Sequence, residues 1–161
     1  MRMEKFEYEF DKAGVTVKGC EKCKEFVPHL ELATKEDWAT EYGDKIISIK
    51  AVKDLFDAIA HINVYGSGHT DCIITEDKQA IYVFINLVDS AGVFANVSTR
   101  FADGFRYGLG AEVGISTSKT HARGPVGLEG LVIYKYKMYG SGQTVAPYAD
   151  GKKTFIHQRI I

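Results

Sequence analysis

The sequence predicts an α/β protein built on parallel strands. Three runs of β-branched and apolar residues lie at 46–52, 71–75 and 92–97, and a stretch with helical periodicity follows each of the first two. Strands joined by one short helical connection run parallel, with a right-handed crossover. Ligands of such sheets bind beyond the carboxyl ends of the strands, so the segment after residue 97 is the first candidate site.

The first 45 residues predict smaller elements. Residues 1–14 predict a short helix, 15–17 a short strand, and 20–26 a helical turn. The stretch 27–40 contains a proline and an acidic, aromatic cluster, which favours a loop.

The strand and helix patterns are clearest from residue 46 onward. The β-branched run 46–52 predicts a mostly buried strand. Residues 54–64 have apolar side chains at helical spacing, and the glycine-containing run 65–68 ends that helix. Asp77 is expected to cap a second helix. The apolar face of this second helix consists of Ile81, Phe84, Ile85 and Val88.

Glycine dominates the segment 107–131. Its spacing, together with Pro125, excludes one continuous helix and predicts an extended crossing that ends in a helical turn at 127–131. Residues 132–139 and 154–161 predict two further strands. A chain this small cannot bury them well, so they suit pairing with another subunit or with a further domain.

Composition narrows the class of protein. The chain has 161 residues, 45% of them apolar and 25% charged, with a net charge of −1. These values are ordinary for a globular protein and provide no field that would attract nucleic acid or an acidic membrane. The sequence shows neither a membrane-spanning apolar run nor a signal peptide, so we expect a cytoplasmic protein.

Three cysteines occur, at positions 20, 23 and 72. Cys20 and Cys23 have the CxxC spacing of a dithiol or of half a zinc site, but no second ligand pair follows, and we expect no metal site. Chance spacing is the favoured interpretation, and a thiol module that uses this pair is the alternative. Cys72 lies within a predicted strand and is expected to be buried and inert.

Several strings in the sequence resemble one enzyme family. The resemblance runs from about residue 14 to residue 161. Its most specific segments are HIN with YGSGHT at 61–70, VDSA at 88–91, STRF at 98–101, and GAEVGIST with HARGP at 110–125. The chain is similar to the carboxyl-terminal third of glutamate-5-semialdehyde dehydrogenase, also called gamma-glutamyl phosphate reductase, in the aldehyde dehydrogenase superfamily. The same activity forms the reductase half of pyrroline-5-carboxylate synthase.

The resemblance implies a reaction. It is the NADPH-dependent reduction of L-glutamyl 5-phosphate to glutamate 5-semialdehyde in proline biosynthesis, through attack of a cysteine thiolate on the acyl phosphate. It also implies a division into a partial catalytic α/β lobe at 1–106, a glycine-rich crossing segment at 107–131, and oligomerisation strands at 132–161.

The departures from the family pattern concern the reacting groups. The family's nucleophilic cysteine and its Rossmann-type cofactor domain lie upstream of the part that this chain resembles, and none of the three cysteines occupies the nucleophile's motif. We therefore expect no catalytic residue here, and no turnover by the chain alone.

Binding residues are expected after the third strand. Arg100 is the best candidate for substrate contact, because a guanidinium forks onto a carboxylate or a phosphate. Ser98 and Thr99 add hydroxyls, and Asn96 is expected to orient them. The alternative is that Arg100 pairs with one of the acids at 103 and 112 to hold the glycine-rich loop.

Other polar residues have weaker assignments. By resemblance, Glu41 contacts the ribose of the nicotinamide cofactor. His69 and His121 are expected to be structural, and Arg123 to bridge to a further domain. The rival to an enzyme is a non-enzymatic assembly module that pairs, through 132–139 and 154–161, with a full-length or amino-terminal partner or with a second copy.

Overall fold

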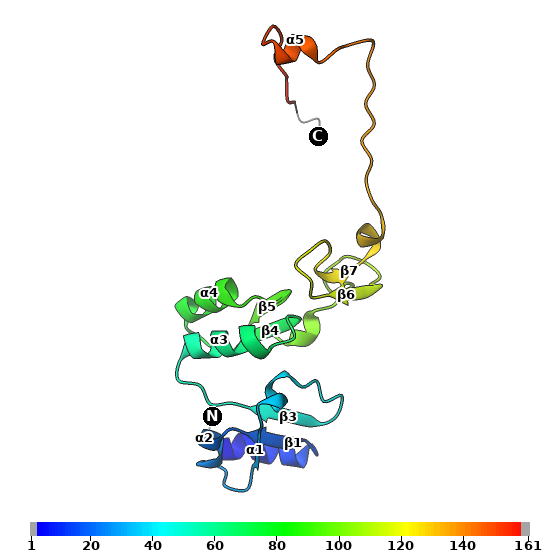
Figure 1. The fold of residues 1–161 in the computed structure, drawn as a ribbon. Coiled ribbons are helices and arrows are strands. Elements are labelled where there is room, and N and C mark those ends of the chain that lie inside the picture. The colour runs from blue at the N-terminus through cyan, green and yellow to red at the C-terminus, as the bar shows by residue number, and fades with distance from the viewer. Residues whose placement is uncertain (1–2, 159–161) are drawn as a thin grey trace.

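The computed structural model describes residues 3–158 and contains two parallel sheets and one hairpin. Figure 1 shows them as successive units along the chain, followed by an extended stretch that leads to a small helix. Mixed α/β structure with parallel strands confirms the predicted class. None of the helices in the described range is long and apolar enough to cross a membrane.

The first unit is a three-stranded parallel sheet with two helices. Helix α1 (Met3–Lys12) precedes β1 (Thr16–Gly19), and α2 (Glu21–Lys24) follows it. The strand order is β2-β1-β3, with β2 at Glu31–Leu32 and β3 at Ile46–Ile49. Its core consists of Val17, Cys23, Val27 and Leu30.

The second unit is the β4–α4–β5 crossover with α3 beside it. Strands β4 (Thr70–Ile73) and β5 (Gly92–Ala95) pair in parallel, and α4 (Lys78–Leu87) connects them. Helix α3 (Leu55–Tyr65) begins at Asp54, whose carboxylate accepts from the backbone N–H of Asp57 at 2.9 Å. The core of this unit consists of Ile59, Phe84 and Val88.

Helices α3 and α4 confirm their sequence signals. Asp77 caps α4 by accepting from the backbone N–H groups of Gln79 and Ala80. Gly66 ends α3, as the glycine-containing run predicted. Of the predicted apolar face of α4, Phe84 and Val88 are buried, whereas Ile85 is 43% exposed.

The strand pairing differs from the prediction at one point. The three predicted strands do not form one sheet, because β3 pairs with β1 and only β4 pairs with β5. β3 is also half-buried instead of mostly buried. The predicted loop at 27–40 contains β2 and the 3₁₀ helix η1 (Glu36–Ala39). A two-residue strand such as β2 has no local signature, since it exists only through its pairing with β1.

The glycine-rich segment folds into more structure than an extended crossing. Strands β6 (Gly114–Ser116) and β7 (Gly124–Val126) form an antiparallel hairpin, which the sequence did not predict. The 3₁₀ helix η2 (Thr99–Phe101) precedes the hairpin. The predicted helical turn is confirmed as η3 (Leu128–Leu131).

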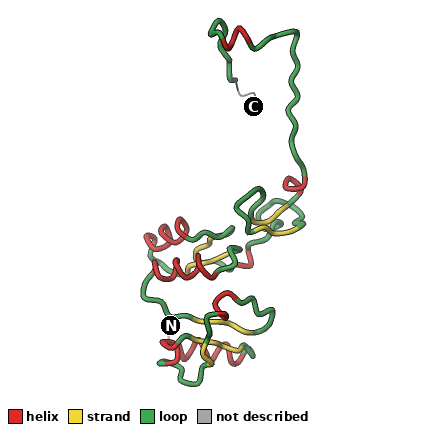
Figure 2. The backbone as a smooth tube through the Cα atoms, viewed as in Figure 1, coloured by secondary structure: helices red, strands yellow, loops and turns green. Residues whose placement is uncertain are grey.

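The two predicted carboxyl-terminal strands are not formed. Residues 132–139 are loop in Figure 2, and a short helix, α5 (Ala146–Ala149), lies between the two predicted strands. Residues 154–158 are loop as well, and 159–161 lie outside the described residues. A strand needs a hydrogen-bonding neighbour, and no described segment provides one here. Pairing with another chain, and the division at 106 and 131, stay predictions.

We predict that Phe84→Ala lowers the free energy of unfolding by about 3–5 kcal/mol, because it removes a ring that is 3% exposed in a small core. Urea unfolding followed by far-ultraviolet circular dichroism measures this change. Tyr82→Ala is the matched control on the same helix, since Tyr82 is 65% exposed and should cost no more than about 1 kcal/mol. Equal losses in the two variants would contradict this assignment of the core.

Candidate functional site

A cleft of about 1060 Å³ opens between the first two units of the chain. One wall comes from the end of η1 and the residues after it, a second from the end of α3 and the start of β4, and a third from η2. The lining residues are Trp38, Ala39, Thr40, Glu41, Val64, Tyr65, Gly66, Ser67, His69, Thr70, Thr99, Arg100, Ala102 and Thr117. The cleft thus collects residues from four separate parts of the sequence.

The cleft does not lie where the rule for parallel sheets places a ligand, which is beyond the carboxyl ends of the strands. β4 contributes only its first residue, Thr70, so the cleft does not lie beyond the carboxyl ends of both strands. The chain after β5 turns back, and η2 lies against β4. The predicted loop is therefore part of the site, but it faces the beginning of β4.

A buried carboxylate holds the first wall. Asp37 accepts hydrogen bonds from the Thr34 backbone N–H at 2.7 Å, from the Tyr42 hydroxyl at 2.7 Å and from the Lys18 ammonium at 3.0 Å. These donors, with the Thr34 N–H first, hold the pKa of Asp37 far below its usual range. The neighbouring segment 38–41, which faces the cleft, is thereby anchored to β1.

Aromatic contacts join this wall to α3. The ring of Trp38 meets His61 edge-on with centroids 5.5 Å apart, and His61 lies 4.8 Å from the ring of Tyr65. Burial, and then the charge of Lys50, lower the pKa of His61, which favours a neutral ring in this contact. Sequence analysis missed this aromatic wall, although Trp38 is the only tryptophan in the chain.

Arg100 offers an unpaired cation to the cleft. Its guanidinium makes no hydrogen bond or ion pair with residues 3–158, while its backbone is held on both sides. The Ser98 hydroxyl accepts from its N–H at 3.2 Å, and Arg106 donates to its carbonyl at 2.7 Å.

The alternative role for Arg100, pairing with an acid, is wrong. Asp103 pairs with Arg106 at 3.3 Å instead. The Glu112 carboxylate accepts from the backbone N–H of Gly104 at 2.8 Å. Both acids hold the loop without Arg100, so its charge remains available to an anion.

The other predicted binding residues do not form one cluster with Arg100. Thr99 lines the cleft, but the Ser98 hydroxyl caps η2 and does not line it. Asn96 has a positive φ of 55°, and its side chain bonds both backbone groups of Thr75, at 2.9 and 2.8 Å. The prediction that Asn96 orients Ser98 and Thr99 is therefore wrong, since it ties the end of β5 to the segment after β4.

Glu41 lies in the cleft with an exposed side chain. It lines the same cleft as Arg100, and the two side chains are not paired with each other. The structure thus brings together the residue predicted for the cofactor ribose and the residue predicted for the substrate anion. What either one binds stays a prediction.

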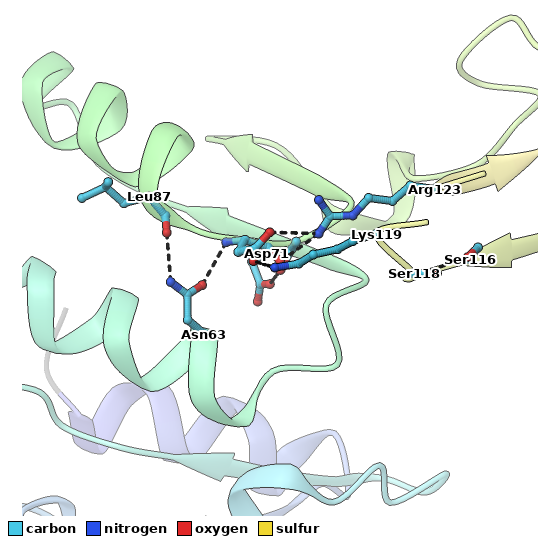
Figure 3. Close-up of polar contacts among 9 residues, drawn as sticks. Asn63, Asp71, Leu87, Ser116, Ser118, Lys119 and Arg123 are labelled. Atoms are coloured by element: carbon cyan, nitrogen blue, oxygen red, sulfur yellow. Dashed lines mark hydrogen bonds and ion pairs between the residues drawn. The ribbon is translucent and has the colours of Figure 1, made fainter. Parts of the chain in front are cut away.

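The most specific sequence strings meet at a polar junction beside the cleft. Figure 3 shows Asn63, Lys119 and Arg123 converging on the turn after α4. Asn63 donates to the Leu87 carbonyl at 2.9 Å and accepts from the Asp89 N–H at 2.9 Å.

The carboxylate of that turn binds two cations from the loop between β6 and β7. Arg123 lies 3.2 Å from the Asp89 carboxylate, and Lys119 forms the second ion pair. Lys119 first, and then Arg123, lower the pKa of Asp89. Arg123 therefore holds the hairpin within this chain, and a bridge from it to a further domain stays a prediction.

The histidines and cysteines give the cleft no nucleophile. The Nδ1 atom of His69 lies 2.7 Å from the Thr70 hydroxyl, and His121 has a positive φ of 63°, both of which fit structural roles. All three cysteines lie in the described range, and none lines the cleft. Cys72 is half-buried, not buried as predicted, and contacts the Val97 carbonyl at 3.1 Å. No metal-binding group of three or more candidate side chains occurs within residues 3–158.

Fold and cleft together define a parallel α/β protein with a polar, cation-bearing cleft. No protein-family model matches the chain. Gamma-glutamyl phosphate reductase of Acetivibrio thermocellus is 57% identical over 150 residues, which are 93% of this chain and 35% of that protein. The reductase of Acaryochloris marina is 68% identical over 129 residues, 80% of this chain and 30% of that protein.

A solved structure gives the same result. The crystal structure of gamma-glutamyl phosphate reductase from Thermotoga maritima matches with a TM-score of 0.81 and 46% identity, over 88% of this chain and 35% of that one. The chain is thus a homologue of the gamma-glutamyl phosphate reductases. It spans about a third of the length of the curated relatives that it matches.

We predict that Asp37→Asn destabilises the wall that carries Trp38, most strongly at neutral pH. Because the pKa of Asp37 is lowered on folding, its contribution is complete above the unfolded value of about 3.9 and is lost as pH falls toward the lower folded value. The stability gap between wild type and variant should therefore shrink below about pH 3.9. Unfolding followed by the fluorescence of Trp38 measures this gap.

Glu36→Gln is the matched control, since Glu36 is an exposed acid in the same 3₁₀ helix. The free energy of unfolding of this variant should equal that of wild type at each pH. A gap for Asp37→Asn that does not change between pH 7 and pH 3 would contradict the role given to this carboxylate.

Proposed function

We propose that the chain provides the substrate-binding and cofactor-facing cleft of an NADPH-dependent reductase that converts L-glutamyl 5-phosphate to glutamate 5-semialdehyde. The observation that carries this proposal is the free guanidinium of Arg100 in the cleft, on a backbone held from both sides. Sequence identity of 57–68% to gamma-glutamyl phosphate reductases supports the choice of substrate.

The charge of the cleft fits this substrate. An acyl phosphate of glutamate carries a phosphate and an α-carboxylate, and a guanidinium binds either one through two parallel hydrogen bonds. Arg100 therefore binds and orients one anionic end, and Thr99 adds a hydroxyl at the same wall.

Glu41 is placed to serve the cofactor. Its carboxylate accepts hydrogen bonds, and ribose hydroxyls are suitable donors. When bound, NADPH would supply the hydride. Trp38 and Tyr65 add apolar surface to the same cleft, where a planar ring can pack.

Within the described residues, the cleft contains no cysteine that could act as the nucleophile of this reaction. The reaction needs a thiolate that attacks the acyl phosphate, and Cys20, Cys23 and Cys72 all lie away from the cleft. The residues of this chain therefore bind and orient, and we expect no semialdehyde to form with the 161-residue chain alone.

We predict that Arg100→Ala weakens binding of inorganic phosphate and of L-glutamate, the stable pieces of the substrate, by about tenfold, because hydrogen bonds to charged groups contribute about 1.5–3 kcal/mol. Arg100→Lys should fall between wild type and Arg100→Ala, since it keeps the charge and loses the fork. Titration followed by the fluorescence of Trp38 measures the binding.

Lys78→Ala is the control, because it removes an exposed positive charge that does not line the cleft. This variant should bind both probes as wild type does. An equal loss for the two alanine variants would show a nonspecific charge effect and contradict the proposal.

A second role, assembly with another chain, has its own observation. Residues 132–139 are extended and highly exposed, with Ile133 at 98%, Tyr136 at 88% and Met138 at 96%. In an extended chain alternate side chains share a face, so Tyr134, Tyr136 and Met138 lie opposite Lys135 and Lys137. A segment with one apolar face and unpaired backbone is suited to strand addition to a second copy or to an amino-terminal partner.

We predict that the purified chain associates and that Tyr134→Ser with Tyr136→Ser reduces this association, because the double variant removes both tyrosines of this face. Sedimentation and light scattering measure the size. Lys135→Ser with Lys137→Ser, which changes the opposite face, should leave association in place. A sharp monomer peak for the wild-type chain would contradict the assembly role.

A further inference from the structure

Two sulfur atoms face each other in the first unit of the chain. The Sγ atoms of Cys20 and Cys23 lie 3.5 Å apart, and the backbone N–H of Cys23 donates to the Cys20 carbonyl at 2.9 Å. Cys20 precedes α2, and Cys23 lies within it, so one helical turn holds both. Neither residue lines the cleft.

The two thiols have different environments. Cys20 is partly exposed, whereas Cys23 is only 1% exposed and belongs to the apolar core. The Sγ of Cys20 also accepts from the backbone N–H of Ala51 at 3.3 Å. One sulfur is therefore open to a reagent, and the other is enclosed behind it.

Hydrogen bonding also separates the acidities of the two thiols. Burial acts to raise the pKa of Cys20, but hydrogen bonds from the backbone of Ala51 and from Cys23 bring that pKa below its ordinary value. Burial, with the neighbouring Cys20, raises the pKa of Cys23. The thiolate forms first on the sulfur that a reagent can reach.

The sheet fixes both sulfurs in place. The Ile49 carbonyl, on β3, accepts from the Cys20 N–H at 3.0 Å and from the Cys23 thiol at 3.6 Å. On the other side a Cβ added to Gly19 would meet the Cβ of Cys23 and a methyl group of Leu30, both at 3.0 Å. The Cys23 side chain is thus confined between β1 and the core, facing Cys20.

A metal does not account for this pair. A tetrahedral zinc site needs four ligands, and the part of the chain that the structure describes offers no third candidate beside these thiols. Two facing thiols of unequal exposure and acidity have the arrangement of an attacking and a resolving cysteine.

We propose that Cys20 and Cys23 form a thiol–disulfide exchange site whose co-reactant is a low-molecular-weight disulfide. The Cys20 thiolate attacks one sulfur of the co-reactant, a mixed disulfide forms, and one thiolate leaves. Cys23 then loses its proton to the solvent, and its sulfur attacks the Sγ of Cys20. The second thiolate leaves, and the protons of the two cysteines protonate the two leaving groups.

The exchange transfers two electrons from the cysteine pair to the co-reactant. The cysteine pair is oxidised to a disulfide, and the co-reactant is reduced to two thiols. Closure needs the Sγ atoms to approach from 3.5 Å to about 2.05 Å, which a small change in the two side chains provides. Reduction by an added dithiol reverses the reaction.

Oxidised glutathione, added to the reduced, folded 161-residue chain, tests this site by thiol counting and peptide mass spectrometry. The wild type should lose two thiols and give a Cys20–Cys23 disulfide, and a dithiol should restore both thiols. Cys72→Ser, which removes the third cysteine, should give the same disulfide at an unchanged rate.

The single variants separate the two roles. Cys23→Ala should stop at a mixed disulfide on Cys20, and Cys20→Ser should leave Cys23 unmodified while the chain is folded. Circular dichroism checks that both variants fold. If Cys23→Ala does not fold, the order of alkylation in the wild type replaces it, with Cys20 expected to be modified before Cys23 and Cys72. A wild-type chain that stays reduced in excess oxidant, or that reacts first at Cys72, overturns the proposal.

Discussion

The interaction that ties the β6–β7 hairpin to the second parallel unit is the ion-pair cluster at Asp89. This carboxylate binds Lys119 and Arg123, while its own backbone N–H is held by Asn63. Three segments that are distant in sequence are joined there. Thr117, two residues before Lys119, lines the cleft.

Polar junctions matter because the apolar cores are small. The fully buried hydrophobic residues among 3–158 form two clusters, one in each parallel unit, and many large apolar side chains remain exposed. Contiguous exposed apolar surface is suited to contact with another chain or segment. Similarity to about a third of a larger reductase agrees with that interpretation.

The two chemically distinctive regions of the chain are physically separate. Arg100 and Glu41 lie in an open cleft, where water-exposed charge suits an anionic or hydroxylated ligand. Cys23 lies in an apolar core, where its sulfur faces the Sγ of Cys20. The cleft therefore fits ligand binding, and the cysteine pair fits covalent exchange.

Sequence by itself determined what local patterns control: the helices at 55–65 and 78–87, the Asp77 cap of the second helix, and the candidacy of Arg100, which depends on the chemistry of one side chain. Only the tertiary structure decided that β3 pairs with β1, that Asn96 holds Thr75, and that Arg123 binds Asp89. Helical periodicity and capping act within a few residues. These strand, hydrogen-bond and ion-pair partners lie 21 to 34 positions apart, so they depend on the path of the whole chain.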